Sequence, residues 1–352
     1  MSGANADLNE ALRRAMPVTR MIDYGMQRAH AEAAHAKSTD GGDWDAILSA
    51  IADAEEGEAG DLEALGKPTY AAEKWHSAAA SLIFAQLRFN FDSARKVELY
   101  KRMSADFAQF AHRSILPVER VTMNLGIGEM FGWHFRSAGK PRAAVVVFGG
   151  LSGWSTAYRS MAEMLRAEGI DCLLVDGPGQ GDSRLLGGVY LTDEAPAGFG
   201  HFIDYLEMQL GPVPVGIWGN SFGGLFAALT SVADDRIRAC CINGAPARCE
   251  VPSFRTPTEQ LAAMFGKRDL LGLDDQMRAL SFDPSEPIKC PVLVLEGGAD
   301  PLVPLGAQDA FLVGNSDPRT AKRTWQDGEH TIYNHARERN DFVTQWFAST
   351  LR

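Results

Sequence analysis

The stretch from Val213 to Val232 contains the clearest candidate for a catalytic side chain, a serine in a Gly-x-Ser-x-Gly pattern. Ser221 lies between Gly219 and Gly223, after one apolar run and before another that is rich in Ala, Leu and Phe. In a nucleophile elbow this spacing puts the serine on a sharp strand-to-helix turn, where the glycines remove Cβ atoms that would collide. Short Gly/Ser patterns also occur by chance, so a packing turn is the alternative. The flanking strand and helix favour Ser221 as a nucleophile at the positive end of a helix.

A serine hydroxyl needs a base to take its proton and an acid to orient that base. Serine, then acid, then histidine is one chain order of such triads, with both partners just beyond strand ends. Asp300 fits the acid position, because it follows the apolar strand of VLVLEGG in a loop stiffened by prolines. The alternative role for Asp300 is a turn or helix cap. Glu296, at the end of the predicted strand, is the weaker candidate for the acid.

His330 fits the base position, because it follows the last short predicted strand and opens the last predicted helix. The other histidines fit less well: His335 lies inside that helix, and His134 and His201 precede Ser221 in the chain. A lone histidine is more often a surface or satisfied core residue than a catalytic one. The chain order and the position at a strand end nevertheless favour His330 as the general base.

The negative charge that develops on a carbonyl oxygen is stabilised by backbone N–H donors in an oxyanion hole. We expect one donor to be the N–H of Phe222, which directly follows the nucleophile. The other should come from the glycine turn after AAVVVF, where Gly150 and Leu151 are both candidates and Leu151 is preferred. Losing one such donor typically costs about 3–4 kcal/mol of transition-state stabilisation.

The glycine-rich loop from Asp176 to Ser183 resembles a phosphate-binding loop only superficially. It lacks the Lys-Ser/Thr of a P-loop and does not fit G-x-G-x-x-G at the start of a helix, so we interpret it as a structural turn beside the site. No spacing of His, Cys and Glu suggests a metal site, and H-E-x-x-H is absent. We therefore expect neither a cofactor nor a metal.

Apolar strands alternate with helical segments over residues 117–352. This alternation predicts an α/β fold in which a mostly parallel sheet has helices on both faces. Ligands of such sheets bind at the carboxyl ends of the strands, where Ser221, Asp300 and His330 are expected. Residues 246–287 form an irregular, proline-containing insertion with two short predicted helices.

Residues 1–116 show helical spacing of apolar residues and no strand alternation. Breaks are predicted at Pro17 and near residues 40–42, 57–60 and 66–68, where Gly and Pro cluster. We interpret this region as a helical cap or lid over the active site. An independent helical bundle beside the catalytic domain is the alternative.

The bulk composition, 45% hydrophobic and 22% charged residues, is that of an ordinary globular protein. A net charge of −11 disfavours nucleic acid or an anionic membrane as a partner, since phosphate binding needs clustered positive charge. No apolar run approaches membrane-spanning length, and no signal peptide is recognisable at the N-terminus. Five cysteines without C-x-x-C spacing argue against a disulfide framework. A reduced cytoplasmic setting is therefore expected.

Four motifs together, GNSFGG, DGPGQGDS, EGGADPLVP and the loop of His330, resemble those of α/β-hydrolases with a helical N-terminal region. The chain is most similar to the group that contains 2,6-dihydroxypseudooxynicotine hydrolase, the fungal hydrolases that shorten polyketides and the FrsA-like esterases. The resemblance covers residues 118–352 well and the N-terminal helices only in size and character. It implies a serine hydrolase in which Ser221, Asp300 and His330 match the triad positions.

The resemblance also implies a substrate class, because several members of the group cleave a C–C bond beside a ketone in aromatic or polyketide substrates. Glu250 is a candidate for an additional carboxylate near the site, and Trp154 and Phe254 are candidates for an apolar pocket that binds a small-molecule carbonyl substrate. Related enzymes are often dimers, so a homodimer is possible. The alternatives are a carboxylesterase or thioesterase, an acyl transferase or cyclase, and a low-turnover ligand-binding protein.

Overall fold

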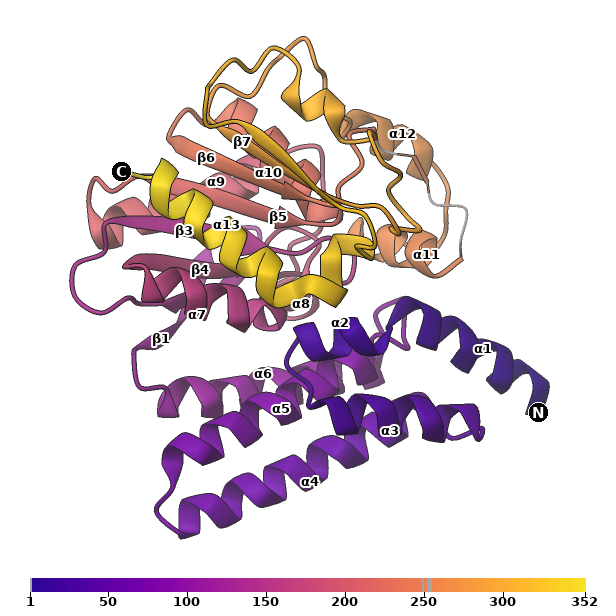
Figure 1. Cartoon of the computed structure of the whole chain (residues 1–352). Helices are drawn as coiled ribbons and strands as arrows, with labels where there is room; N and C mark the ends of the chain where they lie inside the picture. Colours follow the sequence, from indigo (N-terminus) through magenta and orange to yellow (C-terminus); the bar gives the residue numbers. More distant parts are fainter. Residues whose placement is uncertain (1, 249, 252–254) are drawn as a thin grey trace. The chain divides into compact units, whose positions relative to one another are not determined.

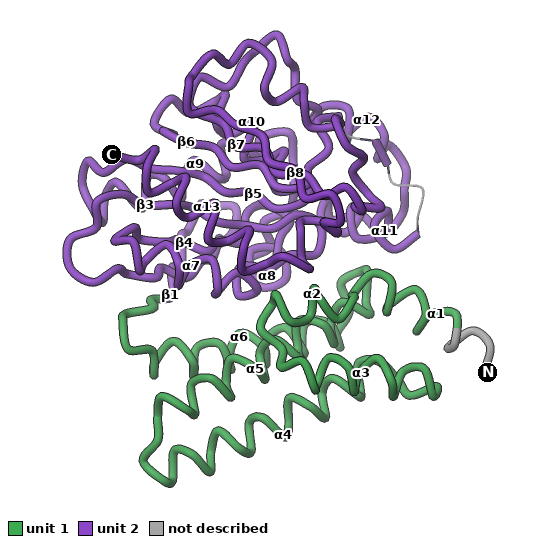
Figure 2. Tube along the Cα trace, viewed as in Figure 1, with its two compact units in different colours: residues 1–119 green, residues 120–352 purple. Residues whose placement is uncertain are grey.

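The computed structural model describes residues 2–248, 250–251 and 255–352 of the chain. It divides into two compact units, residues 1–119 and residues 120–352 (Figure 2). Within the described residues, no helix has both the length and the apolar character needed to cross a membrane.

The first unit consists of helices joined by short turns. Its elements are α1 (Ser2–Ala15), α2 (Val18–Asp23), α3 (Arg28–Thr39), α4 (Trp44–Ala64), α5 (Pro68–Gln86) and α6 (Ala94–Arg113). The three longest, α4, α5 and α6, pack side by side, with α5 between the other two. Helix α5 is buried along most of its length, because its alanines allow close approach from both sides.

Buried polar groups help to hold these helices together. Trp44 is fully buried on α4 and its indole N–H donates to the carbonyl of Phe84 on α5, at 3.0 Å. Glu55, also buried on α4, accepts a hydrogen bond from Gln27 at 3.0 Å and pairs with Lys74 of α5 at 3.3 Å. These contacts anchor the start and the middle of α4.

Helix α4 contradicts one expectation from the sequence, the break predicted near residues 57–60. The helix runs without interruption through Gly57 and Gly60. Each helical glycine costs only about 1 kcal/mol relative to alanine, so the packing of α4 against α5 outweighs the local preference.

The second unit is built on an eight-stranded sheet in the order β1-β2-β4-β3-β5-β6-β7-β8. Strands β2 and β4 are antiparallel, whereas the pairs from β4 through β3, β5, β6 and β7 to β8 are parallel. The strands are β1 (Val118–Asn124), β2 (Glu129–Phe135), β3 (Ala143–Phe148), β4 (Ile170–Asp176), β5 (Val215–Asn220), β6 (Ile237–Asn243), β7 (Val292–Gly297) and β8 (Ala321–Trp325). Every residue of β3, β4, β5 and β7 is buried, as expected for a parallel sheet that is covered on both faces.

Helices cover both faces of this sheet (Figure 1). Helices α7 (Arg159–Ala167) and α13 (Ala336–Thr350) pack together on one face, and α9 (Ala195–Leu210) packs with α10 (Phe222–Ala233) on the other. The short α8 (Gly181–Leu185) follows β4, and α11 (Arg255–Met264) and α12 (Leu273–Ala279) lie in the predicted insertion. The predicted α/β fold, a mostly parallel sheet with a helical N-terminal region, is confirmed.

The second unit also contains two short 3₁₀ turns, η1 (Ser155–Tyr158) before α7 and η2 (Asp309–Leu312) between β7 and β8. The last predicted helix differs from its predicted form. His330 does not open the last long helix directly: it begins a separate 3₁₀ turn, η3 (His330–His335), before α13.

Candidate active site

Ser221 lies on a sharp turn between β5 and α10. Its backbone has φ 57° and ψ −137°, a conformation that L-residues rarely adopt and that costs of order 1–3 kcal/mol. The glycines on either side make the turn possible, because a Cβ on Gly219 would collide with the carbonyl of Gly223, and one on Gly223 would collide with the carbonyl of Gly149. The local sequence therefore produces the strained turn that the Gly-x-Ser-x-Gly pattern predicts.

Three of the predicted residues form a continuous chain of hydrogen bonds. Ser221 Oγ lies 2.8 Å from His330 Nε2, and His330 Nδ1 lies 2.8 Å from Asp300 Oδ2. In the tautomer that suits this geometry, Nδ1–H donates to the carboxylate and Nε2 accepts the serine proton. The Asp300 side chain is 1% exposed and that of His330 is 13% exposed, so the acid is shielded from water and the histidine is partly accessible.

Asp300 is held in place by its own loop. Its Oδ1 atom accepts hydrogen bonds from the backbone N–H groups of Leu302 at 2.8 Å and Val303 at 3.1 Å. This leaves Oδ2 for the histidine. Asp300 therefore has both of the roles considered for it. Oδ1 caps the turn, and Oδ2 contacts His330.

The loop after His330 is strained and then secured by buried side chains. Thr331 and Ile332 have φ values of 49° and 64°, in the left-handed region that is unusual for residues other than glycine. The carbonyl of Thr331 accepts from Asn243 Nδ2 at 3.1 Å and from Arg339 Nη1 at 2.8 Å. Both donors are fully buried. These two bonds oppose relaxation of the strained loop and so fix the position of the imidazole.

The same asparagine connects the histidine loop to the serine. Asn243 Nδ2 also donates to Asn220 Oδ1 at 2.9 Å, and the carbonyl of Asn243 accepts the N–H of Ser221 at 2.8 Å. Asn220 Nδ2 in turn donates to the carbonyl of Phe148 at the end of β3, at 3.2 Å. Buried amides thus tie the carboxyl ends of β3, β5 and β6 to the loop of His330. This network was not predicted from the sequence. A polar Asn at the last position of two apolar strands is the signal that could have indicated it.

The predicted oxyanion donors lie together. Gly150 is so close to the residue after the serine that a Cβ built on it would lie 2.6 Å from the backbone nitrogen of Phe222. Leu151 follows directly and is partly exposed. Both candidates for the second donor therefore belong to the loop that borders the N–H of Phe222.

The other candidates from the sequence lie elsewhere. Glu296 is buried and its carboxylate accepts from the N–H of Gly306 at 2.9 Å and pairs with Lys322 at 3.3 Å, which is a structural role. Trp154 belongs to the loop after β3, and its side chain is buried. Glu250 is exposed and lines a surface cavity with residues of α12 and the 281–284 segment. Phe254 lies outside the described residues.

The three histidines that were weighed against His330 pair away from the triad. His335 contacts Asp327 at 2.9 Å, and the fully buried His134 contacts Asp171 at 3.0 Å. His201 pairs with Asp204 on the same helix at 3.3 Å. Each of the three pairs with a carboxylate, as expected for a histidine that is a surface or satisfied core residue.

The glycine-rich loop after β4 is organised by Asp176. Its carboxylate accepts from the N–H of Ser155 at 2.8 Å, from the hydroxyl of Ser155 at 3.1 Å and from the N–H of Asp182 at 3.1 Å. Burial and the nearby Asp182 carboxylate raise the pKa of Asp176 to about 6. The Asp176 carboxylate thus connects the start of η1 to the glycine-rich loop.

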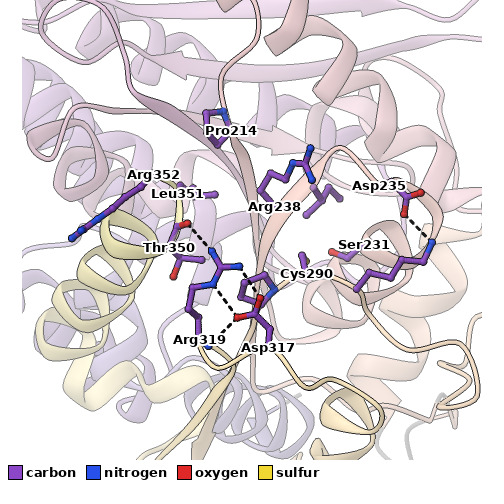
Figure 3. Close-up of a pocket in the computed structure, with 13 residues that line it drawn as sticks. Pro214, Ser231, Asp235, Arg238, Cys290, Asp317, Arg319, Thr350, Leu351 and Arg352 are labelled. Atoms are coloured by element: carbon purple, nitrogen blue, oxygen red, sulfur yellow. Dashed lines mark hydrogen bonds and ion pairs between the residues drawn. The ribbon is translucent and has the colours of Figure 1, made fainter.

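A separate pocket lies at the opposite end of the sheet. It has a volume of about 450 Å³ and is lined by residues at the amino ends of β5, β6 and β7, among them Pro214, Arg238 and Cys290, together with the end of α13 (Figure 3). Its lining includes no member of the Ser221, His330 and Asp300 chain. Across the described part of the chain, no group of three or more His, Cys, Asp and Glu side chains is placed to hold a metal ion.

Comparison with known proteins agrees with this architecture. The family model "Hydrolase_4: Serine aminopeptidase, S33" matches residues 139–286. The crystal structure of 2,6-dihydroxy-pseudo-oxynicotine hydrolase superposes with a TM-score of 0.84 at 22% identity, over 95% of each chain. The chain has the α/β-hydrolase fold.

Two further proteins are similar to this chain. It is 26% identical to 2,6-dihydropseudooxynicotine hydrolase of Paenarthrobacter nicotinovorans, over 83% of this chain and 80% of that one. The structure of AbyA5 has a TM-score of 0.67 at 19% identity, over 85% and 88% of the two chains. The resemblance inferred from the sequence motifs is confirmed at the level of the α/β-hydrolase group.

Proposed function

We propose that this hydrolase uses Ser221 as a nucleophile, His330 as its general base and Asp300 as the group that orients the imidazole. The observation that carries the proposal is the chain of two 2.8 Å hydrogen bonds from Ser221 through His330 to Asp300, at the carboxyl ends of parallel strands. His330 Nε2 takes the proton of Ser221 as its Oγ attacks a substrate carbonyl, and Asp300 stabilises the imidazolium that forms.

The oxyanion of the resulting tetrahedral intermediate is stabilised by the N–H of Phe222 and by that of Gly150 or Leu151. When the intermediate collapses, His330 returns its proton to the leaving group. Water then attacks the acyl-enzyme by the same route in reverse. A direct attack by water, with His330 as the base, is the variant of this mechanism known among C–C hydrolases.

The substrate we propose is an aromatic or polyketide-like small molecule, cleaved at a C–C bond beside a ketone. The similarity to 2,6-dihydropseudooxynicotine hydrolase over most of both chains supports this class. A carbon leaving group needs an electron sink, which a neighbouring ketone or phenol ring supplies. Hydrolysis of an ester or thioester needs no such sink and uses the same three side chains.

The experiment that tests the triad is active-site labelling with a fluorophosphonate, followed by peptide mass spectrometry. We expect the wild type to be labelled at Ser221, and Ser221→Ala to lose labelling and about 10⁶-fold in kcat. Ser231→Ala is the matched control: Ser231 lies on α10, and its hydroxyl donates to the helix carbonyl of Ala227 at 2.7 Å. Absence of label at Ser221 in the folded wild type would overturn the proposal.

A panel of β-diketones, esters and thioesters tests the substrate class. We expect turnover of β-diketones, with incorporation of one water molecule per bond cleaved. Turnover of esters alone would replace the C–C assignment by a carboxylesterase. Products formed without added water would indicate an acyl transferase or cyclase instead.

The remaining expectations from the sequence stay predictions. They are a cap role for residues 1–116, substrate-pocket roles for Trp154 and Glu250, a cytoplasmic location and a homodimer. Buried, unbridged thiols at Cys172, Cys240 and Cys241 are consistent with a reducing compartment. Light scattering coupled to size-exclusion chromatography measures the oligomeric state directly.

A further inference from the structure

Gln180 is a buried side chain with no role in the mechanism above, yet its amide contacts the backbone of the proposed oxyanion hole. The residue is 1% exposed. Its Nε2 atom donates to two successive carbonyls, that of Gly149 at 2.5 Å and that of Gly150 at 3.2 Å. Its Oε1 atom accepts the N–H of Gly177 at 3.0 Å. The amide therefore joins the loop after β4 to the loop after β3.

These contacts determine which way the candidate oxyanion donors point. In a planar trans peptide, the C=O of one residue and the N–H of the next point in opposite directions. Because the carbonyl of Gly149 faces Gln180, the N–H of Gly150 faces away from it. The carbonyl of Gly150 orients the N–H of Leu151 in the same manner. One side chain thus orients both candidates for the second donor.

The position of the loop agrees with this role. Gly150 packs against the backbone nitrogen of Phe222, the first expected donor. The far end of the loop is fixed independently, because the N–H and hydroxyl of Ser155 both donate to the buried carboxylate of Asp176. Residues 149–155, which we call the oxyanion loop, are therefore held at one end by Gln180 and at the other by Asp176.

We propose that Gln180 is a positioning residue of this enzyme, which holds the peptide N–H groups of Gly150 and Leu151 toward the oxyanion site beside the N–H of Phe222. The inference rests on the proposed serine-hydrolase function. The proposal gives the glycine-rich loop after β4 a role in the site, although this loop contributes no member of the triad. Gln180 does not touch the reacting atoms; it acts through the carbonyls of the oxyanion loop.

The test uses fluorophosphonate labelling of the full-length protein, because that reaction needs no known substrate. Ser221 Oγ forms a bond to phosphorus, fluoride leaves, the serine proton passes to His330, and the phosphoryl oxygen occupies the oxyanion hole. In Gln180→Met, which keeps the side-chain length and lacks the donors, we expect the maximal labelling rate to fall about 10–100-fold. The half-saturating probe concentration should change by less than about threefold, since binding before the reaction does not use the oxyanion hole.

Asn315→Leu is the matched control. Asn315 Nδ2 also donates to two carbonyls, those of Ile288 at 2.9 Å and Cys290 at 2.7 Å, but it lies at the amino end of β7. If both amides are merely structural, both variants will lower the melting temperature and leave the labelling rate of the folded protein unchanged. A normal labelling rate in folded Gln180→Met would overturn the proposal.

Gln180→Glu gives a second, pH-dependent readout, and it serves if Gln180→Met fails to fold. A neutral carboxylic acid retains one O–H donor for the loop, whereas its carboxylate has none and repels both carbonyl oxygens. We expect the ratio of the Gln180→Glu rate to the wild-type rate to rise as the pH falls from 8 to 5. A ratio that stays constant near one contradicts the role of Gln180. Wild-type protein that is not labelled at Ser221 contradicts the triad instead, so the two failures are distinguishable.

Discussion

The two ends of the sheet in the second unit differ in the contacts that hold them together. At the carboxyl ends, fully buried amides and a buried arginine bind backbone carbonyls, and three non-glycine residues have positive φ: Ser221, Thr331 and Ile332. At the amino ends, the pocket is bordered by exposed ion pairs, Lys289 with Asp235 at 3.0 Å and Arg319 with Asp317 at 2.7 Å.

The two ends therefore differ in how firmly the backbone is held. Strained backbone persists only where the surroundings over-determine it, and a buried amide that binds a carbonyl does so because leaving either group unpaired costs about 1–3 kcal/mol. Exposed ion pairs contribute about 0–1 kcal/mol and tolerate loss of a partner. The carboxyl end is therefore the rigid end, and it contains the proposed triad.

Among the substitutions that compare the two ends, Asp300→Asn at the carboxyl end has the largest expected effect. The variant retains the size of the side chain, but its amide disfavours the imidazole tautomer that accepts the proton of Ser221. We expect kcat to fall about 10⁴-fold, with a change in melting temperature of only a few degrees, since Leu302 and Val303 can still donate to the amide oxygen. Steady-state kinetics with thermal unfolding measures both. A loss of less than tenfold would contradict the orienting role of Asp300.

An intermediate effect is expected on the pH dependence of stability, from Asp176→Asn. The raised pKa of Asp176, about 6, means that the native protein keeps this proton at pH values where the unfolded chain has lost it. Its contribution to stability is therefore largest near pH 4 and is lost as the pH rises through 6. Asp176→Asn has no titrating group at this position, so its stability does not fall for this reason as the pH rises. We expect its deficit in melting temperature relative to wild type to shrink by a few degrees between pH 4 and pH 6.

Asp317→Asn is the control for that measurement, because the pKa shift at the amino end has the opposite sign. Hydrogen bonds from Arg319 lower the pKa of Asp317 to about 2. Its contribution is present above pH 4 and is lost only as the pH falls toward 2. Between pH 4 and 6 the difference between this variant and wild type should stay constant. Equal slopes for the two variants would contradict the contrast between the two ends.

The smallest effect is expected from Arg319→Ala, at the amino end. This substitution removes the ion pair with Asp317 and a hydrogen bond to the carbonyl of Thr350, both exposed or partly so. We expect kcat and the labelling rate at Ser221 to be unchanged, and the free energy of unfolding to fall by no more than about 1 kcal/mol. Labelling kinetics and chemical denaturation measure the two quantities. A large loss of activity would show that the amino-end pocket communicates with the triad.

Much of this molecule follows from local sequence patterns. Apolar runs alternating with helical segments predict the parallel sheet, because strands buried on both faces need helices to cover them. The Gly-x-Ser-x-Gly pattern predicts the strained turn at Ser221, since only glycines fit beside it. Chain order and strand ends suffice to select Asp300 and His330 from several acids and histidines. Each of these inferences depends on residues that are adjacent in the sequence or on the regular geometry of one sheet.

The contacts that hold those side chains in place depend on the tertiary structure. Gln180 binds carbonyls 31 and 30 positions away in the chain, and Asn243 binds the carbonyl of Thr331, 88 positions away. An amide in a glycine-rich loop has no periodicity that points to its partner. Its partner depends on which loops meet when the strands align. The sequence by itself thus determined the fold class and the candidate triad. The long-range hydrogen bonds that orient the site depend on distances that exist only after the sheet has formed.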